Sequence, residues 1–398
     1  MFNILSHIPS SIKKLHHSLI VKNAIGSWVF CNNGNKYLDL TSGIGALSTG
    51  HSHPYLIDKI QEQVEKYVHI PQQVYGSHMS QIELTQKLID IMPDSSLDNI
   101  FYVNSGSEAT DNALKIARRY TGKKNIITMN KGFHGRSLGA LSITSSNLTC
   151  KLDTQPLLPG IFFCNNDTQT SLDLILNHQS SPEETCCIIL EPILGEGGIY
   201  SMDKEFMKYV REICTQHNIL LIADEVQCGS GRTGTWWDIE QKEVIPDMIT
   251  FGKGIASGFP LAGVASNHKI MNVGKNFLGG TYGGNAICSV AASATIDIMK
   301  KENLLQNVTE MGEYFSQQIQ QIQNFDQIKE IRQHGLMIAI ELNNTSRVMN
   351  IVDRLRDEGV LVLTAGNNGQ YIRLLPPLNI SQKELNIFFE KFDIVLRE

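Results

Sequence analysis

The chain lacks the marks of nucleic-acid-binding, secreted and membrane-spanning proteins. Its 34 Lys and Arg residues are outnumbered by 40 Asp and Glu residues, so the formal net charge is −6 over 398 residues. Nucleic acid and anionic membranes are therefore poor partners. The eight cysteines include no C-x-x-C pair, which argues against a zinc site or a disulfide framework. No apolar run approaches the ~20 residues of a membrane span, and the first residues lack the charged head and apolar core of a signal peptide. We expect a soluble, cytoplasmic protein without a metal site.

Short apolar runs alternate with helical patterns between residues 54 and 285. The runs are N-I-F-Y-V-N, N-I-I-T-M-N, C-C-I-I-L-E-P, I-L-L-I-A-D-E-V, M-I-T-F-G and L-A-G-V-A-S. Continuous apolar runs are typical of strands that are buried on both faces. Their alternation with helices predicts an α/β fold with a mostly parallel sheet. Ligands of such sheets bind beyond the carboxyl ends of the strands.

The two ends of the chain follow other patterns. Residues 1–50 hold short strand-like pieces such as S-W-V-F and K-Y-L-D-L, and residues 289–398 mix short strands with helices. The S-x-x-E spacing of Ser381 and Glu384 predicts a capping box at the start of the last helix. We therefore divide the chain into an N-terminal segment 1–50, a large domain 51–288 and a small α+β domain 289–398.

Two predicted strand ends deliver a carboxylate and a lysine. The run I-L-L-I-A-D ends at Asp224, and M-I-T-F-G-K ends at Lys253. Each residue alone could be a solvated charge at a strand end. Together they suit a pyridine-aldehyde cofactor, because the lysine can form a Schiff base and the carboxylate can keep the ring nitrogen protonated. Val226 and Gln227 follow Asp224 at spacings that could place one on the ring and the other at its phenolic oxygen.

Three further segments carry residues suited to a flat, phosphorylated ligand. N-S-G-S-E-A-T-D places Gly106 and Ser107 at a strand-to-helix turn, where backbone N–H groups can bind an anion or simply cap the helix. F-H-G-R-S offers Phe133 for ring stacking and Arg136 for a carboxylate, although either could be an ordinary core or surface residue. L-G-G-T-Y-G-G-N places Thr281 among glycines, as a phosphate donor or as part of a flexible loop.

Taken together, these segments resemble the class III, or ω-amino acid type, pyridoxal-phosphate aminotransferases. The motifs N-S-G-S-E-A, F-H-G-R, G-E-G-G, A-D-E-V-Q-x-G-x-G-R-T-G, K-G-I-A-S-G-F-P and G-G-T-Y-G-G-N follow one another in the family's order. The resemblance covers nearly the whole chain. It implies the fold-type I architecture, with a mainly parallel seven-stranded sheet in the large domain and a small domain built from both chain ends. It also implies a homodimer whose active sites lie at the subunit interface.

The resemblance assigns roles around the pyridoxal phosphate ring. Lys253 would bond covalently to the cofactor and shuttle protons, and Asp224 would pair with the ring nitrogen. Val226 and Phe133 would cover the two faces of the ring. Gln227 would bond the O3′ oxygen.

The resemblance also assigns residues to the phosphate and to the substrates. Gly106 and Ser107 would bind the phosphate, with Thr281 reaching in from the partner subunit. Arg136 would hold the distal carboxylate of an ω-amino acid. Arg373 would hold the α-carboxylate of 2-oxoglutarate, and Glu196 would cover Arg373 when the donor lacks that group, because an unpaired buried guanidinium is costly.

The choice of donor stays open at this point. Ile44 stands where 4-aminobutyrate enzymes of the family tend to have isoleucine and ornithine enzymes an aromatic residue, so the chain is more similar to the 4-aminobutyrate branch. The alternatives are an acetylornithine or ornithine aminotransferase and an amino-acid or lactam racemase on the same fold. A non-catalytic binding protein would be expected to lose Lys253 or Asp224, and both are present. The sequence assigns no role to Cys228, Trp236 or Trp237.

Overall fold

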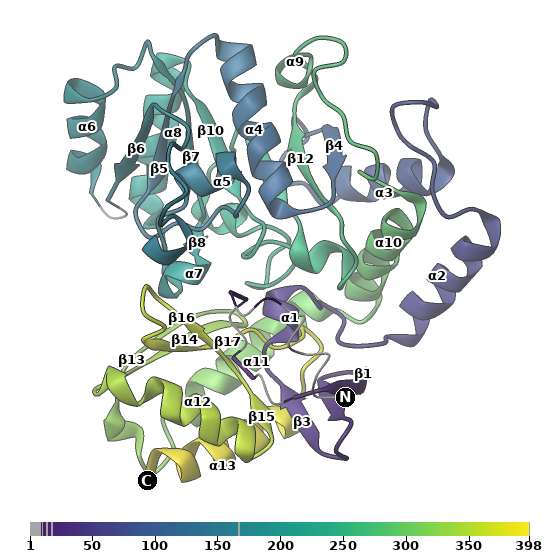
Figure 1. Ribbon diagram of the computed structural model, residues 1–398, viewed down its shortest axis with the longest axis vertical. Helices are drawn as coiled ribbons and strands as arrows, with labels where there is room; N and C mark the ends of the chain where they lie inside the picture. The colour runs from purple at the N-terminus through teal and green to yellow at the C-terminus, as the bar shows by residue number, and fades with distance from the viewer. Residues whose placement is uncertain (1–8, 10, 13–14, 17–18, 166–167, 398) are drawn as a thin grey trace.

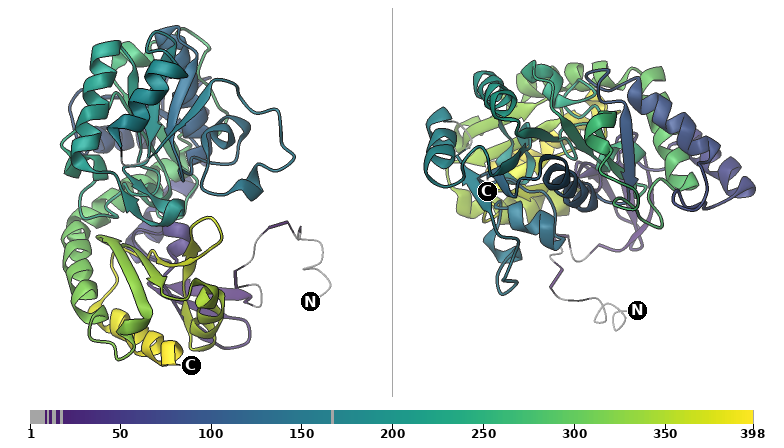
Figure 2. Two further views of the ribbon diagram at one scale, coloured as in Figure 1. Left: turned by 90° about the vertical axis from the view of Figure 1, so that its left-hand side faces the viewer. Right: turned by 90° about the horizontal axis from the view of Figure 1, so that it is seen from above.

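The protein folds into two lobes that are joined along one side by a long helix (Figure 1). The computed structural model describes residues 9, 11, 12, 15, 16, 19–165 and 168–397. The upper lobe holds a seven-stranded sheet, and the lower lobe holds two four-stranded sheets. Figure 2 shows the same two lobes from the side, with the yellow C-terminal helix in the lower lobe.

The seven-stranded sheet is mainly parallel, as the sequence predicts. Only β12 runs antiparallel to its neighbours β11 and β4, and the other pairings are parallel. The strand I-F-F-C was not predicted, because it is short, lies at the sheet edge and is fully buried only at its last residue. The strands in spatial order are β4 (Asn99–Val103), β12 (Ala262–Ser266), β11 (Met248–Phe251), β10 (Leu220–Asp224), β7 (Thr185–Leu190), β5 (Asn125–Met129) and β6 (Ile161–Cys164).

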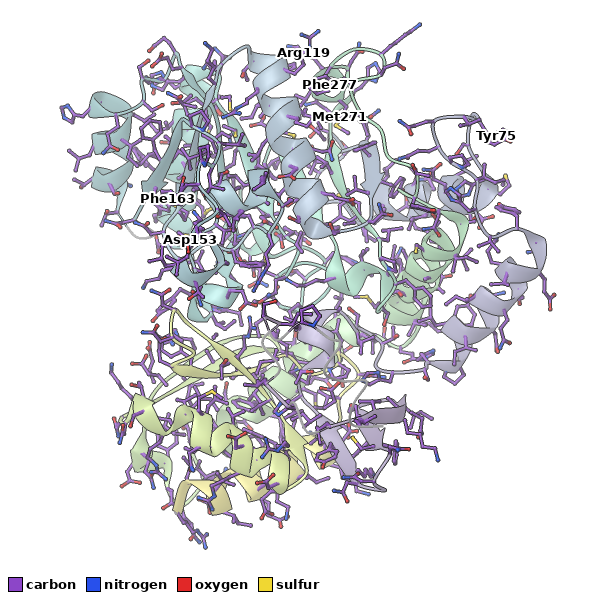
Figure 3. All side chains as sticks on the ribbon, in the orientation of Figure 1. Tyr75, Arg119, Asp153, Phe163, Met271 and Phe277 are labelled. Atoms are coloured by element: carbon purple, nitrogen blue, oxygen red, sulfur yellow. The ribbon has the colours of Figure 1, made fainter. Side chains whose placement is uncertain are left out.

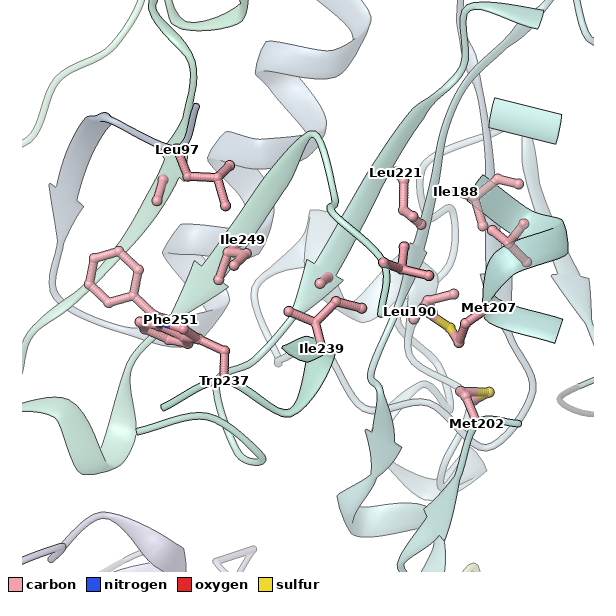
Figure 4. Close-up of a cluster of buried hydrophobic side chains, with 14 of the residues drawn as sticks. Leu97, Ile188, Leu190, Met202, Met207, Leu221, Trp237, Ile239, Ile249 and Phe251 are labelled. Carbon is pink, nitrogen blue, oxygen red and sulfur yellow. The ribbon is translucent and has the colours of Figure 1, made fainter. Parts of the chain in front are cut away.

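Helices cover both faces of this sheet, so its central strands are buried on both sides. One face packs against α4 (Gly106–Thr121), α5 (Leu138–Ile143) and α9 (His268–Met271). The other face packs against α3 (Met79–Ile89), α6 (Gln169–His178), α8 (Lys204–His217) and α10 (Ala286–Lys301). Figure 4 shows part of this second core, in which Trp237 packs on Phe251. The indole Nε1 of Trp237 donates to the carbonyl of Ile91 at 2.6 Å, so this side chain belongs to the core.

The lower lobe combines both ends of the chain. Its antiparallel sheet has the order β13 (Ile328–His334), β14 (Met337–Leu342), β17 (Tyr371–Leu374) and β16 (Leu363–Ala365). Its second sheet has the order β1 (Val21–Ile25), β2 (Trp28–Cys31), β3 (Lys36–Asp39) and β15 (Val360–Leu361). The parallel pairing of β3 with β15 joins the N-terminal segment to the C-terminal part of the chain. The helices of this lobe are α11 (Leu304–Ile319), α12 (Val348–Asp357) and α13 (Gln382–Arg397).

Local signals place the ends of several elements. The predicted capping box is present before α13, because the backbone N–H of Ser381 donates to Glu384 Oε2 at 2.9 Å and that of Glu384 donates to Ser381 Oγ at 3.4 Å.

Helix α10 contributes residues to the cores of both lobes, so the predicted boundary at residue 288 falls inside a shared helix. The boundaries at residues 50 and 288 stay predictions. The remaining α-helices and strands are α1 (Ser42–Gly45), α2 (Pro54–Lys66), β8 (Ile193–Leu194), α7 (Gly195–Gly198) and β9 (Tyr200–Ser201).

Among the residues that the structure describes, no helix is both long and apolar enough to cross a membrane. The same residues contain no group of three or more His, Cys, Asp and Glu side chains arranged to hold a metal ion.

Candidate active site

A cavity of about 260 Å³ lies beyond the carboxyl ends of the parallel strands. The segments that follow β4, β5, β7, β10 and β11 each contribute to its wall, which agrees with the expected position of a ligand site in this type of sheet. The lining residues are Gly106, Ser107, Phe133, His134, Gly135, Arg136, Glu191, Asp224, Val226, Gln227 and Lys253. The structure therefore gathers most of the predicted site residues around one space.

Asp224 is buried at the end of β10 and is paired within the protein. Only 3% of the surface of Asp224 is exposed. Its Oδ2 lies 2.6 Å from Nδ1 of His134, and its Oδ1 accepts the backbone N–H of Val226 at 3.2 Å. The other ring nitrogen of His134 lies 3.2 Å from Thr128 Oγ1. Burial disfavours a charged imidazole, but the hydrogen bond and charge of Asp224 outweigh it and raise the pKa of His134.

The interpretation of the sequence missed His134, although the sequence itself contains a signal for this residue. A buried carboxylate needs a partner, and F-H-G-R follows a neighbouring strand of the same sheet. The interpretation considered only an external ring nitrogen as the partner of Asp224. The structure instead shows a partner within the protein, Nδ1 of His134.

Lys253 lies at the end of β11, in the turn Lys253–Ala256, with a backbone φ of 43°. Its side chain lines the cavity. Burial lowers the pKa of Lys253, although the carboxylates of Glu196, Glu191 and Asp224 oppose this change. A lysine with a lowered pKa is a better nucleophile and base at neutral pH.

The start of α4 leaves backbone donors at the cavity. Ser105 caps the helix and forms a capping box with Glu108. The first intrahelical bond is donated by Ala109, so the N–H groups of Gly106 and Ser107 remain for a ligand. A Cβ on Gly106 would lie 2.7 Å from Val226 Cγ1, so only glycine fits there.

The loop that carries Phe133 and Arg136 docks on this helix start. Ser107 Oγ accepts the backbone N–H of Arg136 at 3.1 Å and that of Ser137 at 3.0 Å. Gly135 has a φ of +135°, and a Cβ there would lie 2.2 Å from Ser107 Oγ. The loop and the helix can approach this closely because residue 135 has no side chain.

Arg373 and Glu196 form an ion pair beside the cavity. Nη1 of Arg373 lies 2.7 Å from Glu196 Oε1 and 3.4 Å from Gln227 Oε1. Burial opposes the charge on Glu196, but the guanidinium of Arg373 outweighs this and lowers the pKa of Glu196. This is the pairing that the family resemblance implies for a donor without an α-carboxylate.

Glu191 is buried between two walls of the cavity. Its Oε1 accepts the backbone N–H of Phe133 at 2.8 Å, and its Oε2 accepts that of Gly195 at 3.0 Å. Burial raises the pKa of Glu191 to about 7. The residue therefore joins the Phe133 loop to the α7 turn, and it is not a surface ion.

Three predicted substrate and cofactor contacts are exposed in the single chain. Ile44 is 46% exposed, and Thr281 and Arg136 are exposed as well. Ile44 and Thr281 do not line the cavity, whereas Arg136 does.

Cys228 has a structural role, because its buried thiol donates to Glu225 Oε2 at 3.1 Å.

The Asp224–His134 pair makes stability depend on pH. The variant His134→Asn keeps a hydrogen-bond donor that cannot take a proton, and we expect it to lower the free energy of unfolding by about 1–2 kcal/mol at acidic pH. The folded pKa of His134 lies above its ordinary value of 6.5. Its contribution is therefore complete below pH 6.5 and is lost as the pH rises through the raised pKa.

Thermal unfolding of wild type and variant at several pH values measures this effect. The variant His178→Asn removes an exposed histidine on α6 and serves as the control. A midpoint difference for His134→Asn that stays constant from acidic to alkaline pH would contradict the assignment.

Comparisons with known proteins agree with this geometry. A family model described as Aminotransferase class-III matches residues 10–396. The 5-aminovalerate aminotransferase DavT of Pseudomonas putida is 36% identical over 390 residues, which cover 93% of this chain and 91% of the relative. The acetylornithine aminotransferase of Archaeoglobus fulgidus is 36% identical over 371 residues, with 92% and 93% coverage. The 4-aminobutyrate aminotransferase GabT of Escherichia coli is 35% identical over 399 residues, with 95% and 93% coverage.

A solved structure shares the fold over the whole chain. The ornithine aminotransferase of Toxoplasma gondii, whose structure is described as having partial occupancy of PLP at its active site, is 26% identical with a TM-score of 0.90. The match covers 99% of this chain and 93% of that chain. The protein therefore belongs to the class III aminotransferases, a family of pyridoxal-phosphate enzymes with the fold-type I architecture.

Proposed function

We propose that this aminotransferase moves the terminal amine of an ω-amino acid similar in length to 4-aminobutyrate to 2-oxoglutarate by a ping-pong mechanism. The observation that carries the proposal is the Arg373–Glu196 pair beside Lys253. A carboxylate that neutralises a substrate-binding arginine lets one site accept both a donor without an α-carboxylate and an acceptor that has one.

The cavity residues fit pyridoxal phosphate as the cofactor. The N–H groups of Gly106 and Ser107 would hold its phosphate, and Asp224 would face its ring nitrogen. Phe133 and Val226 line the same cavity and would cover the ring. When bound, pyridoxal phosphate supplies an aldehyde that joins the substrate amine and a protonated ring that withdraws electrons from the reacting carbon.

The protein's own residues move and hold the protons of the reaction. Nζ of Lys253 would take a proton from the terminal carbon of the donor, and its lowered pKa leaves it free to do so. Asp224 would keep the ring nitrogen protonated, and His134 holds Asp224 in place. Gln227 would bond the O3′ oxygen of the cofactor from its position between the cavity and Arg373.

Two arginines would sort the substrates by their carboxylates. Arg136 lies at the cavity wall with an exposed side chain, where it would bind the distal carboxylate of the donor. The α-carboxylate of 2-oxoglutarate would replace Glu196 on Arg373. Ile44 would add an aliphatic wall without a hydrogen bond to a second amino group.

The active form in this proposal is a homodimer in the cytoplasm. The segments around α2 and α3 expose many apolar side chains, and Tyr75 projects from this side of the molecule in Figure 3. Several exposed apolar side chains on these segments support a protein partner. A second copy on this face would bring Thr281 to the phosphate of its neighbour. The exposed apolar residues are Val64, Val68, Val74, Tyr75, Met79, Ile82 and Tyr282.

Two alternative reactions use the same site. Acetylornithine or ornithine transfer has support from a relative of equal identity. A racemase or epimerase would need no acceptor, so the Arg373–Glu196 pair favours transfer over racemisation.

The variant Lys253→Ala tests the chemistry. We expect it to lose turnover and the visible absorbance of the bound cofactor, because no other described side chain of the cavity is a lysine. The variant Lys115→Ala, on the exposed side of α4, is the control. A Lys253→Ala enzyme with full activity would exclude the assignment.

Titration of the visible absorbance with single donors tests the substrate. We expect 4-aminobutyrate or 5-aminovalerate to convert the spectrum to the near-ultraviolet amine form of the cofactor at lower concentration than N-acetylornithine does. The physical reason is that Ile44 gives a longer, polar donor no hydrogen bond. A preference for N-acetylornithine would move the protein to the acetylornithine branch.

The variant Arg373→Ala tests the exchange of carboxylates. Losing a charge-assisted contact costs about 1.5–3 kcal/mol, so the KM for 2-oxoglutarate should rise about 10- to 150-fold. The KM for the donor should change far less. The variant Arg356→Ala, on α12, controls for the loss of a partly buried arginine of the same lobe. Equal weakening of both half-reactions by Arg373→Ala would contradict the role.

A further inference from the structure

The antiparallel sheet of the lower lobe aligns two arginines in one row. Arg332 on β13 pairs with Ala339 on β14, and Ala339 pairs with Arg373 on β17. Directly opposed residues of neighbouring strands project from the same face of a sheet. The small side chain of Ala339 leaves space between the two arginines. Both can therefore reach the α7 turn, which Figure 1 shows at the base of the upper lobe.

The lower lobe holds the α7 turn at three points. Nη1 of Arg373 bonds the Glu196 side chain at 2.7 Å. Nε of Arg332 donates to the carbonyl of Gly198 at 2.8 Å, and the N–H of Gly366 donates to the carbonyl of Glu196 at 2.9 Å. Two of these contacts hold the backbone of the turn, and they do not depend on where the Glu196 carboxylate points.

Arg332 is itself fixed between two aromatic rings. Its guanidinium carbon lies 4.4 Å from the ring centroids of both Tyr200 and Tyr371, and the two tyrosine hydroxyls are 3.1 Å apart. Tyr200 follows the α7 turn in β9, and Tyr371 lies two residues before Arg373 on β17. Glu341 Oε2 lies 3.0 Å from Nη1 of Arg332. The two ring planes stand at 77° to each other. A cation that contacts both rings thus links the turn to the strand that carries Arg373.

The α7 backbone also packs directly on this cluster. A Cβ on Gly198, whose φ is +120°, would lie 2.6 Å from Cε2 of Tyr371. The Glu196 side chain is 28% exposed, whereas the side chain of Arg332 is 7% exposed. The carboxylate therefore has room to rotate while the turn beneath it does not.

We propose that Arg332, held between Tyr200 and Tyr371, is a positioning residue that fixes the α7 turn so that only the Glu196 side chain moves when Arg373 changes partner. The proposal rests on the proposed function, because it gives the carboxylate exchange at Arg373 a fixed support. A fixed turn strengthens the Glu196–Arg373 pair, since little freedom is lost when the pair forms. A loosened turn weakens the pair, and with it the binding of donors that need Arg373 neutralised. Substrates that bind Arg373 through their own α-carboxylate displace Glu196, so a weaker pair does not reduce their binding.

The variant Arg332→Lys separates these two cases. It keeps a positive charge facing Glu341 but loses the Nε donor and the guanidinium group that contacts both rings. We expect the apparent dissociation constant of 4-aminobutyrate in the donor half-reaction to rise about tenfold. That of glutamate, measured in the reverse half-reaction of the same holoenzyme, should not rise, because glutamate displaces Glu196 from Arg373. Stopped-flow absorbance of the bound cofactor measures both values.

A matched control and two milder variants complete the test. Lys329→Met removes the other cation that bonds Glu341, at 2.7 Å, and should leave the ratio of the two constants unchanged. Tyr200→Phe and Tyr371→Phe keep the rings and remove the bond between the hydroxyls. They should shift the ratio in the same direction by about two- to threefold, and they decide the matter if Arg332→Lys does not fold.

Two outcomes overturn the proposal. One is equal weakening of 4-aminobutyrate and glutamate binding, which would mean a general loss of structure. The other is an unchanged ratio in the folded variants. If Arg373→Ala also fails to separate donor from acceptor, the proposed function itself falls. If Arg373→Ala behaves as expected and Arg332→Lys does not, only the positioning role of Arg332 falls.

Discussion

The cost of burying a carboxylate governs the arrangement around Asp224. Every residue of β10 is buried, and Asp224 ends that strand with almost no exposure. An unpaired charge at such a place is costly, so it must find a partner from a neighbouring strand end. His134 from the segment after β5 provides one, and this contact draws the whole F-H-G-R loop over the cavity. Phe133 and Arg136 are placed at the cavity wall as a consequence.

A chain of buried polar groups continues from this pair to the lower lobe. Glu191 joins the Phe133 loop to the α7 turn, and Gln227 lies between the cavity and Arg373. The protonation state of each ionisable group in this chain depends on the neighbouring groups, because all of them share one poorly solvated space. Effects of single substitutions here should not add, since they alter a common network. Lys253 and Arg373 are therefore electrostatically linked.

Much of this site could be predicted from the sequence, because parallel strands bring their carboxyl ends to one edge. Asp224 and Lys253 end apolar runs, and the structure places both at one cavity. The partner of Asp224 was missed, because pairing depends on which strands are neighbours in space. The row of Arg332, Ala339 and Arg373 could not be predicted from the sequence either, because it depends on the register between the strands. Strand β6 escaped prediction because its apolar run, I-F-F-C, is only four residues long.

The pairing of β3 with β15 has a consequence for how the protein is made. Residues 36–39 are synthesised long before their partner at residues 360–361. A contact between such distant parts of the chain forms slowly, since a very long loop must close first. The N-terminal strands therefore wait, unpaired on one edge, while the seven-stranded sheet between them and their partner folds. An exposed strand edge invites pairing with other chains, so the nascent strands β1 to β3 need protection from such pairing until β15 is made.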